Sequence, residues 1–224
     1  MKKGKLIVIE GTDCSGKETQ TQKLINYLKA QGEKVTTLSF PMYDTPTGRI
    51  IGGPLLGKEY ICDGWFPEGA THVDGKVASL FYAADRYYNL DKITDALENG
   101  YTVILDRYVY SNMGHQAGKL EVKEERLERY KFIEKLEFDL LGLPKPDGVI
   151  LLFMPVEGAK EIRAKRPEKL DEAESDEKHL LLAQNAYLEM AELYNFKVIN
   201  CAADGKIRSI DEIGQDVIKI YNEI

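Results

Sequence analysis

Long apolar runs are absent from the sequence. Its first apolar run covers only residues 6–9, after a basic start, and is too short for the core of a signal peptide. No stretch approaches the roughly 18 apolar residues that a membrane-spanning helix needs. Cysteine is also scarce: Cys14, Cys62 and Cys201 lie far apart and form no CxxC pair. We therefore expect a cytoplasmic protein with reduced thiols and no membrane partner.

An excess of positive charge is absent as well. The 30 basic and 37 acidic residues give a formal net charge of -7, which argues against a surface built to bind nucleic acid. A local basic pocket for phosphate groups is compatible with that balance. Because no repeat, low-complexity tract or linker divides the 224 residues, we expect one domain over residues 1–224 with a sizeable buried core.

Short apolar runs alternate with helical patterns along the chain. Runs such as LIVI at residues 6–9 are typical of strands that are buried on both faces of a parallel sheet. The patterns predict strands at residues 5–10, 35–40, 101–105, 148–154 and 197–201, and helices at residues 19–30, 77–98, 123–141, 156–166, 180–194 and 209–221. Residues 41–75 are rich in Gly and Pro and predict a long functional loop with some helix inside it. The alternation indicates an α/β fold, with a five-stranded parallel sheet between layers of helices.

A glycine-bracketed loop lies between the first predicted strand and the first helix. Its sequence, GTDCSGK over residues 11–17, fits the phosphate-binding pattern G-x-x-x-x-G-K in the context that the pattern requires. The glycines let backbone N–H groups close around phosphate oxygens, the helix N-terminus adds a favourable dipole, and Lys17 adds a positive charge. The alternative is a glycine turn with a chance lysine. We predict an ATP site formed by Gly11, Asp13, Cys14, Ser15, Gly16, Lys17, Glu18 and Thr19.

The residue after that lysine departs from the pattern. A Ser or Thr whose hydroxyl binds Mg²⁺ is expected there, and this chain has Glu18, followed by Thr19. Glu18 either binds the metal itself, since carboxylates are ordinary Mg²⁺ ligands, or turns away and leaves the metal to Asp106 and water. In a third reading, its charge repels the phosphates and weakens nucleotide binding. We predict Glu18 and Asp106 as the metal ligands.

Further motifs recur over most of the chain. They are IEGTDCSGKETQ at residues 9–20, FP at 40–41, LFYAADR at 80–86, DRYVYSN at 106–112, KPD at 145–147, LDEAE at 170–174 and VINC at 198–201. In this combination the chain resembles the thymidylate (dTMP) kinase family. The resemblance implies the P-loop NTPase fold with a mobile lid, a homodimer, and Mg²⁺-dependent transfer of a phosphoryl group from ATP to dTMP, giving dTDP and ADP.

The resemblance also assigns roles around the acceptor phosphate. Asp13 stands where family members contact the sugar hydroxyl of the acceptor, and its alternative is a turn-capping aspartate. Arg107 matches the arginine that grips the acceptor phosphate, and its planar fork suits a two-point contact. Asp106 matches a metal-associated carboxylate, although it could instead form a structural ion pair with Arg107. Lys17, Asp106 and Arg107 are therefore predicted catalytic residues.

The expected contacts with the base and sugar come from two segments. Tyr82 and Arg86 lie four residues apart on one predicted helix face, where the family has an aromatic residue that stacks on thymine and an arginine that binds a base carbonyl. The alternative for Tyr82 is a core aromatic. His115 stands where family members often have Tyr or Phe near the sugar 2′ position, and its alternative is a structural histidine. The other predicted contacts are Phe40, Ser111, Asn112 and Gln116.

A charged stretch at residues 163–177 resembles the family's lid. The family places an arginine over the transferring phosphate, from the P-loop or from the lid, because phosphoryl transfer depends on positioning and charge stabilisation. The P-loop position holds Cys14 here, so the resemblance assigns this charge to the lid, with Arg163 and Arg166 as predicted catalytic residues and Lys165 as a further candidate. The alternative is a solvated charge run.

Departures from the family pattern leave two other functions open. His115, Tyr82 and a segment at residues 60–72 that looks longer than usual favour a kinase of the same fold with another nucleoside monophosphate as acceptor. Glu18 favours a nucleotide-binding protein with weak catalysis. The predicted acceptor site argues against that second alternative, because a mere binder has little use for both halves of the site.

Overall fold

The computed structural model describes residues 3–164, 176–203 and 206–224. Its main sheet has the strand order β2-β3-β1-β4-β5, and every neighbouring pair is parallel. The strands are β1 (Leu6–Gly11), β2 (Val35–Ser39), β3 (Thr102–Asp106), β4 (Gly148–Phe153) and β5 (Lys197–Asn200). The predicted five-stranded parallel sheet is therefore confirmed.

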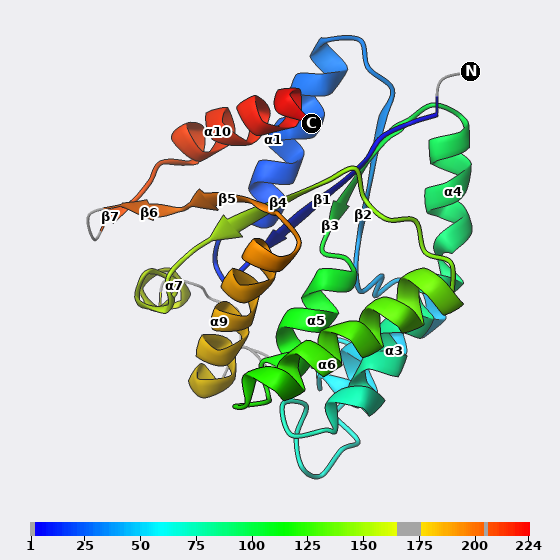
Figure 1. Cartoon of the computed structure of the whole chain (residues 1–224), viewed down its shortest axis with the longest axis vertical. Helices are drawn as coiled ribbons and strands as arrows, with labels where there is room; N and C mark the ends of the chain where they lie inside the picture. Colours follow the sequence, from blue (N-terminus) through cyan, green and yellow to red (C-terminus); the bar gives the residue numbers. More distant parts are fainter. Residues whose placement is uncertain (1–2, 165–175, 204–205) are drawn as a thin grey trace.

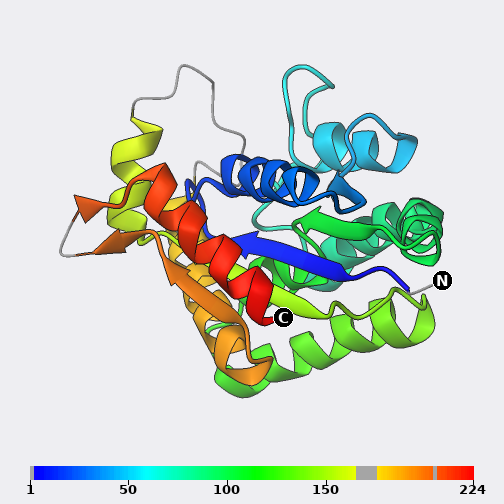
Figure 2. The same cartoon turned by 90° about the horizontal axis from the view of Figure 1, so that it is seen from above.

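Helices cover both faces of this sheet (Figure 1, Figure 2). Side chains alternate along a strand, so Ile7 and Ile9 of β1 face one layer while Leu6 and Val8 face the other. The first layer contains α1 (Lys17–Ala30), α7 (Val156–Arg163) and α10 (Ile210–Glu223). The second contains α4 (Leu90–Glu98), α5 (Val109–Ala117), α6 (Lys123–Glu134) and α9 (Glu177–Leu193).

The segment between β2 and α3 (Gly75–Tyr88) forms a small core of its own against α3. It contains α2 (Pro46–Ile50) and a π-helical turn η1 (Ile51–Leu55), which agrees with the expected loop with some helix inside it. Asp85 of α3 accepts hydrogen bonds from Met42 N at 2.9 Å and Thr47 Oγ1 at 2.7 Å, so α3 holds the beginning of the segment in place. This connection brings residues 40–73 to the carboxyl edge of the sheet.

Several predicted helices differ in extent from those of the structure. The single helix predicted at residues 77–98 is divided into α3 and α4 at Asn89, whose side-chain amide donates to Asp85 O at 2.9 Å. The helix predicted at residues 123–141 is α6 followed by a π-helical turn, η2 (Lys135–Leu140). Two elements were not predicted: α5, and a short hairpin of β6 (Ala202–Ala203) and β7 (Lys206–Ile207). No helix in the described ranges is long and apolar enough to cross a bilayer.

The central strands end at the edge of the sheet where the candidate site lies. β1 leads into the glycine loop, β2 into the cis peptide bond Phe40–Pro41, and β3 into Arg107. Backbone hydrogen bonds join these exits, from Phe40 N to Asp106 O and from Arg107 N to Ile9 O, both at 3.1 Å. In parallel α/β sheets, ligands bind outside the carboxyl ends of the strands, which is where the predicted motifs meet.

Candidate active site: two adjoining cavities

The glycine loop follows β1 and ends where α1 begins at Lys17. Cys14 and Gly16 adopt positive φ angles of 55° and 76°, so the loop turns sharply into the helix. Gly11 has a different requirement: a Cβ there would lie 2.7 Å from Leu152 O, so a larger residue would displace β4. The backbone thus has the strand–loop–helix form of a phosphate-binding loop.

Lys17 lies inside the loop that it is predicted to serve. Its ammonium group donates to the carbonyl oxygens of Gly11 at 3.0 Å and Thr12 at 3.1 Å. Burial, together with the charge of Arg107, lowers the pKa of Lys17 to about 8. A bound phosphate would stabilise the charged form of Lys17 further and replace the two carbonyl acceptors.

A cavity opens beside this loop. It is lined by the loop itself, by the end of β2 and the residues after it, and by Asp106 and Arg107 at the end of β3. The predicted ATP residues that line it are Asp13, Cys14, Ser15, Gly16, Lys17, Glu18 and Thr19. Gly11, the first residue of the predicted set, lines the adjoining cavity instead.

Carboxylates in the loop cavity fit a magnesium ion. Asp106 is half-buried at the end of β3, and Glu18 is exposed in the first turn of α1. Within the described ranges, no group of three or more His, Cys, Asp and Glu side chains could hold a metal by itself. That donor set suits Mg²⁺, which proteins bind through one or two carboxylates together with substrate phosphates and water.

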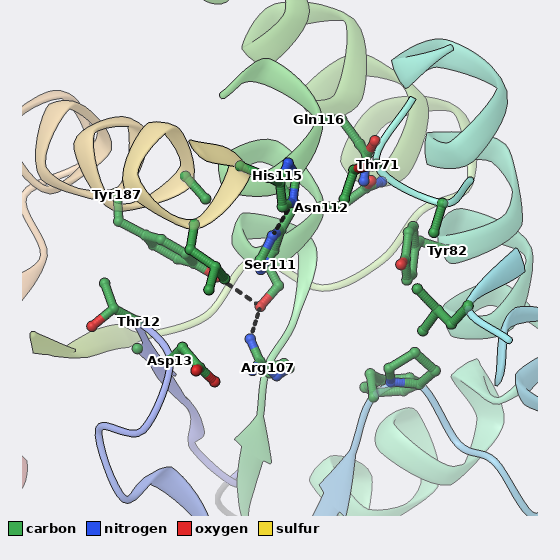
Figure 3. Close-up of a pocket in the computed structure, with 18 of the residues that line it drawn as sticks. Thr12, Asp13, Thr71, Tyr82, Arg107, Ser111, Asn112, His115, Gln116 and Tyr187 are labelled. Carbon is green, nitrogen blue, oxygen red and sulfur yellow. Dashed lines mark hydrogen bonds between the residues drawn. The ribbon is translucent and has the colours of Figure 1, made fainter. Parts of the chain in front are cut away.

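The second cavity lies between α3, α5 and α9 (Figure 3). Tyr82 stands across it from Tyr187, Gln116 and Thr71 lie at one end, and Arg107 and Asp13 lie at the other. All of the predicted acceptor residues line it, namely Asp13, Phe40, Tyr82, Arg86, Arg107, Ser111, Asn112, His115 and Gln116. The structure therefore brings together side chains from four separate stretches of the sequence.

Arg107 lines both cavities. It occupies the turn between β3 and α5 with a φ of 66°, which is uncommon for a residue other than glycine. Its Nη1 atom donates to Ser111 Oγ at 3.4 Å. Burial alone would lower the pKa of Arg107, but Tyr187, Asp106 and Glu10 outweigh that effect and raise it. The guanidinium is therefore a permanent positive charge between the two cavities.

Arg86 is held by a buried ion pair. Its Nε and Nη2 atoms donate to the two carboxylate oxygens of Glu137, and both side chains are almost fully buried. Asn112 donates to the same carboxylate at 2.8 Å, which ties α3, α5 and η2 together. The guanidinium fork has five N–H donors, so the ion pair leaves donors for a ligand in the cavity.

Three amide oxygens in this second cavity, the acceptor cavity, lack a hydrogen-bond partner among the described residues. They are Gln116 Oε1, Asn112 Oδ1 and Gln184 Oε1, and the first two side chains are almost fully buried. An unsatisfied buried polar atom costs free energy, so such atoms indicate a ligand with N–H donors. The imide of a pyrimidine base carries such a donor.

His115 contacts a histidine that the sequence patterns did not indicate. Its Nδ1 atom lies 3.1 Å from Nε2 of His179, in the first turn of α9, and the two rings stack. Burial mainly, and the neighbouring His179 to a smaller extent, hold the pKa of His115 well below 6.5. His115 is thus a neutral side chain in the cavity wall at neutral pH.

The predicted lid begins beside the glycine loop. Arg163 Nε lies 3.2 Å from Asp13 Oδ2, and both side chains are mostly buried. This contact brings a predicted lid arginine next to Asp13, one of the residues that line both cavities. Arg166 and Lys165 lie outside the described residues, as does most of the predicted lid at residues 163–177.

Sequence patterns missed other side chains of the site. Lys58 and Thr71 line the acceptor cavity from the segment after β2, and Tyr187 lines it from α9. None of these three residues belongs to a short motif, so the sequence alone does not mark them as site residues. Glu10 is buried beside the cavity residues Ser111 and Tyr187. Its sequence signal is a lone carboxylate at the end of an apolar strand, which is costly to bury without partners.

Known proteins match this chain along nearly its full length. A family model described as thymidylate kinase matches residues 9–212. The thymidylate kinase of Dictyostelium discoideum is 29% identical, with 99% of this chain and 86% of that protein covered. A probable thymidylate kinase of Pyrococcus abyssi is 31% identical, with 97% of this chain and 96% of that protein covered. The solved thymidylate kinase of Candida albicans matches with a TM-score of 0.72 at 26% identity, covering 99% and 92% of the two chains.

Proposed function

The chain belongs to the thymidylate kinase family, and we propose that it transfers the γ-phosphoryl group of ATP to dTMP, giving ADP and dTDP. One observation carries this proposal: the phosphate loop cavity and the acceptor cavity adjoin, and Asp13 and Arg107 line both. An enzyme that only hydrolysed a nucleotide would not need the second cavity. A kinase needs both, because its two phosphates must meet in line.

On the donor side, the loop residues and Lys17 hold the ATP phosphates. The backbone N–H groups of the loop and the N-terminus of α1 attract phosphate oxygens, and the Lys17 ammonium offsets the charge on the β- and γ-phosphates. Asp106 and Glu18 hold Mg²⁺ together with the phosphates, and the metal supplies charge neutralisation when it is bound.

On the acceptor side, the cavity binds dTMP through its base, sugar and phosphate. Tyr82 stacks on the base, while Arg86 and Asn112 bind its polar edge. Asp13 accepts from the sugar hydroxyl, and His115 lies beside the sugar. Phe40, Ser111 and Gln116 complete the cavity wall.

Charge stabilisation of the transferring group comes from arginines of two segments. Arg107 grips the acceptor phosphate, whose oxygen attacks the γ-phosphorus as the bond to ADP breaks. Arg163, from the start of the lid at residues 163–177, lies beside Asp13 and offsets the developing negative charge, together with Arg166. Lid closure excludes water and suppresses hydrolysis of ATP.

The chain works as a homodimer of single domains in the cytoplasm. A row of exposed apolar side chains on α3, made of Val77, Leu80 and Tyr87, offers a face for a second copy. These residues lie three and seven positions apart, so they share one side of the helix. The cysteines of the described residues are free thiols, which supports a reducing compartment.

A panel of acceptors tests this proposal. Release of ADP is measured with dTMP, dUMP, dCMP, dGMP and UMP at saturating ATP and Mg²⁺. We expect the largest kcat/KM with dTMP. Strong use of another acceptor without dTMP turnover would replace dTMP with that acceptor, whereas ATP binding without any transfer would leave only a nucleotide-binding protein. The panel matters because the solved Candida albicans relative is described as having broad substrate specificity.

A further inference from the structure

Glu10 is a buried carboxylate that stands one residue before the glycine loop. It ends the apolar run of β1 and is 0% exposed. Because side chains alternate along the strand, Glu10 faces the same layer as Leu6 and Val8, which is the layer of α5 and α9. A charged group without exposure needs close partners, since burial of an unpaired carboxylate is very costly.

Its partners lie in α5, at the residue before α5, and in α9, and these two helices are among those that line the acceptor cavity. Glu10 Oε1 accepts from the backbone N–H groups of Tyr108 and Ser111, both at 2.9 Å. Glu10 Oε2 accepts from Ser111 Oγ at 2.6 Å and from Tyr187 OH at 3.2 Å. These bonds place a carboxylate at the N-terminus of α5, where no side chain of α5 itself caps the helix. Glu10 therefore caps α5 from a different element.

The same bonds connect Glu10 to Arg107. The hydroxyl of Ser111 donates its proton to Glu10, so its oxygen lone pairs remain available to accept from Arg107 Nη1 at 3.4 Å. Arg107 lies immediately before α5, and its own backbone N–H donates to Ile9 O, the residue before Glu10. Arg107 is thus held at its backbone by β1 and at its guanidinium group through Ser111 and Glu10.

We infer that Glu10 is a positioning residue for phosphoryl transfer, which sets the guanidinium of Arg107 relative to the glycine loop. Glu10 is also covalently joined to Gly11, the first residue of the loop that holds ATP. It therefore connects this loop to the hydrogen bonds that hold Arg107. The inference rests on the proposed role of Arg107 as the acceptor-phosphate ligand. Glu10 itself lines neither cavity and acts through Ser111 and Arg107.

The Glu10→Gln variant tests the inference without removing a buried side chain. Its amide oxygen still accepts from the two backbone N–H groups, but its amide nitrogen donates to Ser111 Oγ and reverses the direction of that hydrogen bond. We expect the KM for dTMP to rise about tenfold and kcat to fall about tenfold, with the KM for ATP within about twofold of wild type. A role as a helix cap alone would lower the unfolding temperature and leave both KM values unchanged, which would overturn the inference.

Two tyrosine variants, one at the acceptor cavity and one away from it, provide a comparison. Tyr187 and Tyr130 are both 1% exposed, but the Tyr187 hydroxyl donates to Glu10, whereas the Tyr130 hydroxyl donates to Glu189 of α9, which does not line the acceptor cavity. Tyr187→Phe should change the KM for dTMP in the same direction as Glu10→Gln and by a smaller factor. Tyr130→Phe should leave it unchanged. Equal effects of the two variants would contradict the inference.

The Arg107→Lys background separates this inference from the proposed function. If Arg107 binds the acceptor phosphate, Arg107→Lys alone raises the KM for dTMP, and adding Glu10→Gln changes it little further. If Arg107→Lys leaves that KM unchanged, the proposed role of Arg107 fails. If Arg107→Lys raises it but Glu10→Gln has no effect, or if the two effects multiply, the proposed role stands and the inference about Glu10 fails.

Discussion

At the scale of single residues, the acceptor cavity concentrates positive charge in a protein that is acidic as a whole. The chain carries a net charge of -7, yet Lys58, Arg86, Arg107 and Lys119 all line the acceptor cavity. Three of these side chains, Arg86, Arg107 and Lys119, donate hydrogen bonds to other groups of the protein. A nucleoside monophosphate therefore meets hydrogen-bond donors that are already oriented, which reduces the conformational entropy that the side chains lose on binding.

His115 should make the folding stability depend on pH. Its pKa in the folded state is held well below 6.5 by burial, whereas the unfolded chain has a histidine pKa of about 6.5. Below that pH the unfolded state binds a proton that the folded state does not, so stability is lost as pH falls. We expect the free energy of unfolding to decrease below about pH 6.5 by up to about 1.4 kcal/mol per pH unit more than in a His115→Phe variant.

Urea unfolding of both proteins between about pH 7.5 and 5.5 measures this difference, since the carboxylates that titrate in acid are common to both chains and cancel. Parallel pH profiles of the two proteins would contradict the expectation. They would show that the folded protein accepts a proton at His115 as readily as the unfolded chain does.

At the scale of elements, sequence patterns predict short apolar strands, periodic helices and the glycine-bracketed loop, and miss a short helix that is buried on all sides. The central strands β1, β3 and β4 were predicted because both of their faces are apolar, and the glycine loop because its motif is local. Helix α5 was missed because nearly every one of its residues is buried, so no polar face alternates with an apolar one. Its residues include Gly114 and Asn112, which are weak helix formers.

The acceptor site was predictable only where it belongs to a motif. Arg107, Ser111 and Asn112 lie in one short segment that resembles the family, and the structure places all three at one cavity. His179 and Tyr187 lie far from that segment in sequence and reach the cavity only because α9 packs on α5. No local pattern records such a contact, because it depends on how two helices cross.

The close approach of α5 and α9 gives a test at this scale. A Cβ on Gly118, the residue that ends α5, would lie 2.7 Å from Gly114 O and 3.0 Å from the backbone of Ala183 in α9. Gly118→Ala should therefore push α9 away, lower the free energy of unfolding by about 1–3 kcal/mol and raise the KM for dTMP. Denaturant unfolding and steady-state kinetics measure the two effects.

The control for that variant lies in α10, whose N-terminus has a capping box between Ser209 and Glu212. Ser209→Ala should cost about 1 kcal/mol of stability through loss of the cap. Because α10 covers the other face of the sheet from the acceptor cavity, both KM values should stay unchanged. If Gly118→Ala destabilises the protein without changing the KM for dTMP, then the spacing of α5 and α9 does not set the acceptor site.

At the scale of the whole molecule, helix α3 would connect the acceptor cavity to the proposed dimer. Tyr82 and Arg86 face the cavity from one side of this helix, while Leu80 and Tyr87 are exposed on another, at 52% and 54%. A second copy that covers the exposed side would order the helix that carries Tyr82 and Arg86. Dimer formation and acceptor binding should therefore change together.

Leu80→Glu tests that coupling, because a charge in an apolar interface costs several kcal/mol of association. We expect light scattering to show a dimer for wild type and a monomer for the variant, with a higher KM for dTMP and a KM for ATP within about twofold of wild type. Leu140→Glu is the matched control, since Leu140 is also exposed, at 69%, but lies on η2. A dimer in both variants would place the interface elsewhere, and a monomer with an unchanged KM for dTMP would separate assembly from acceptor binding.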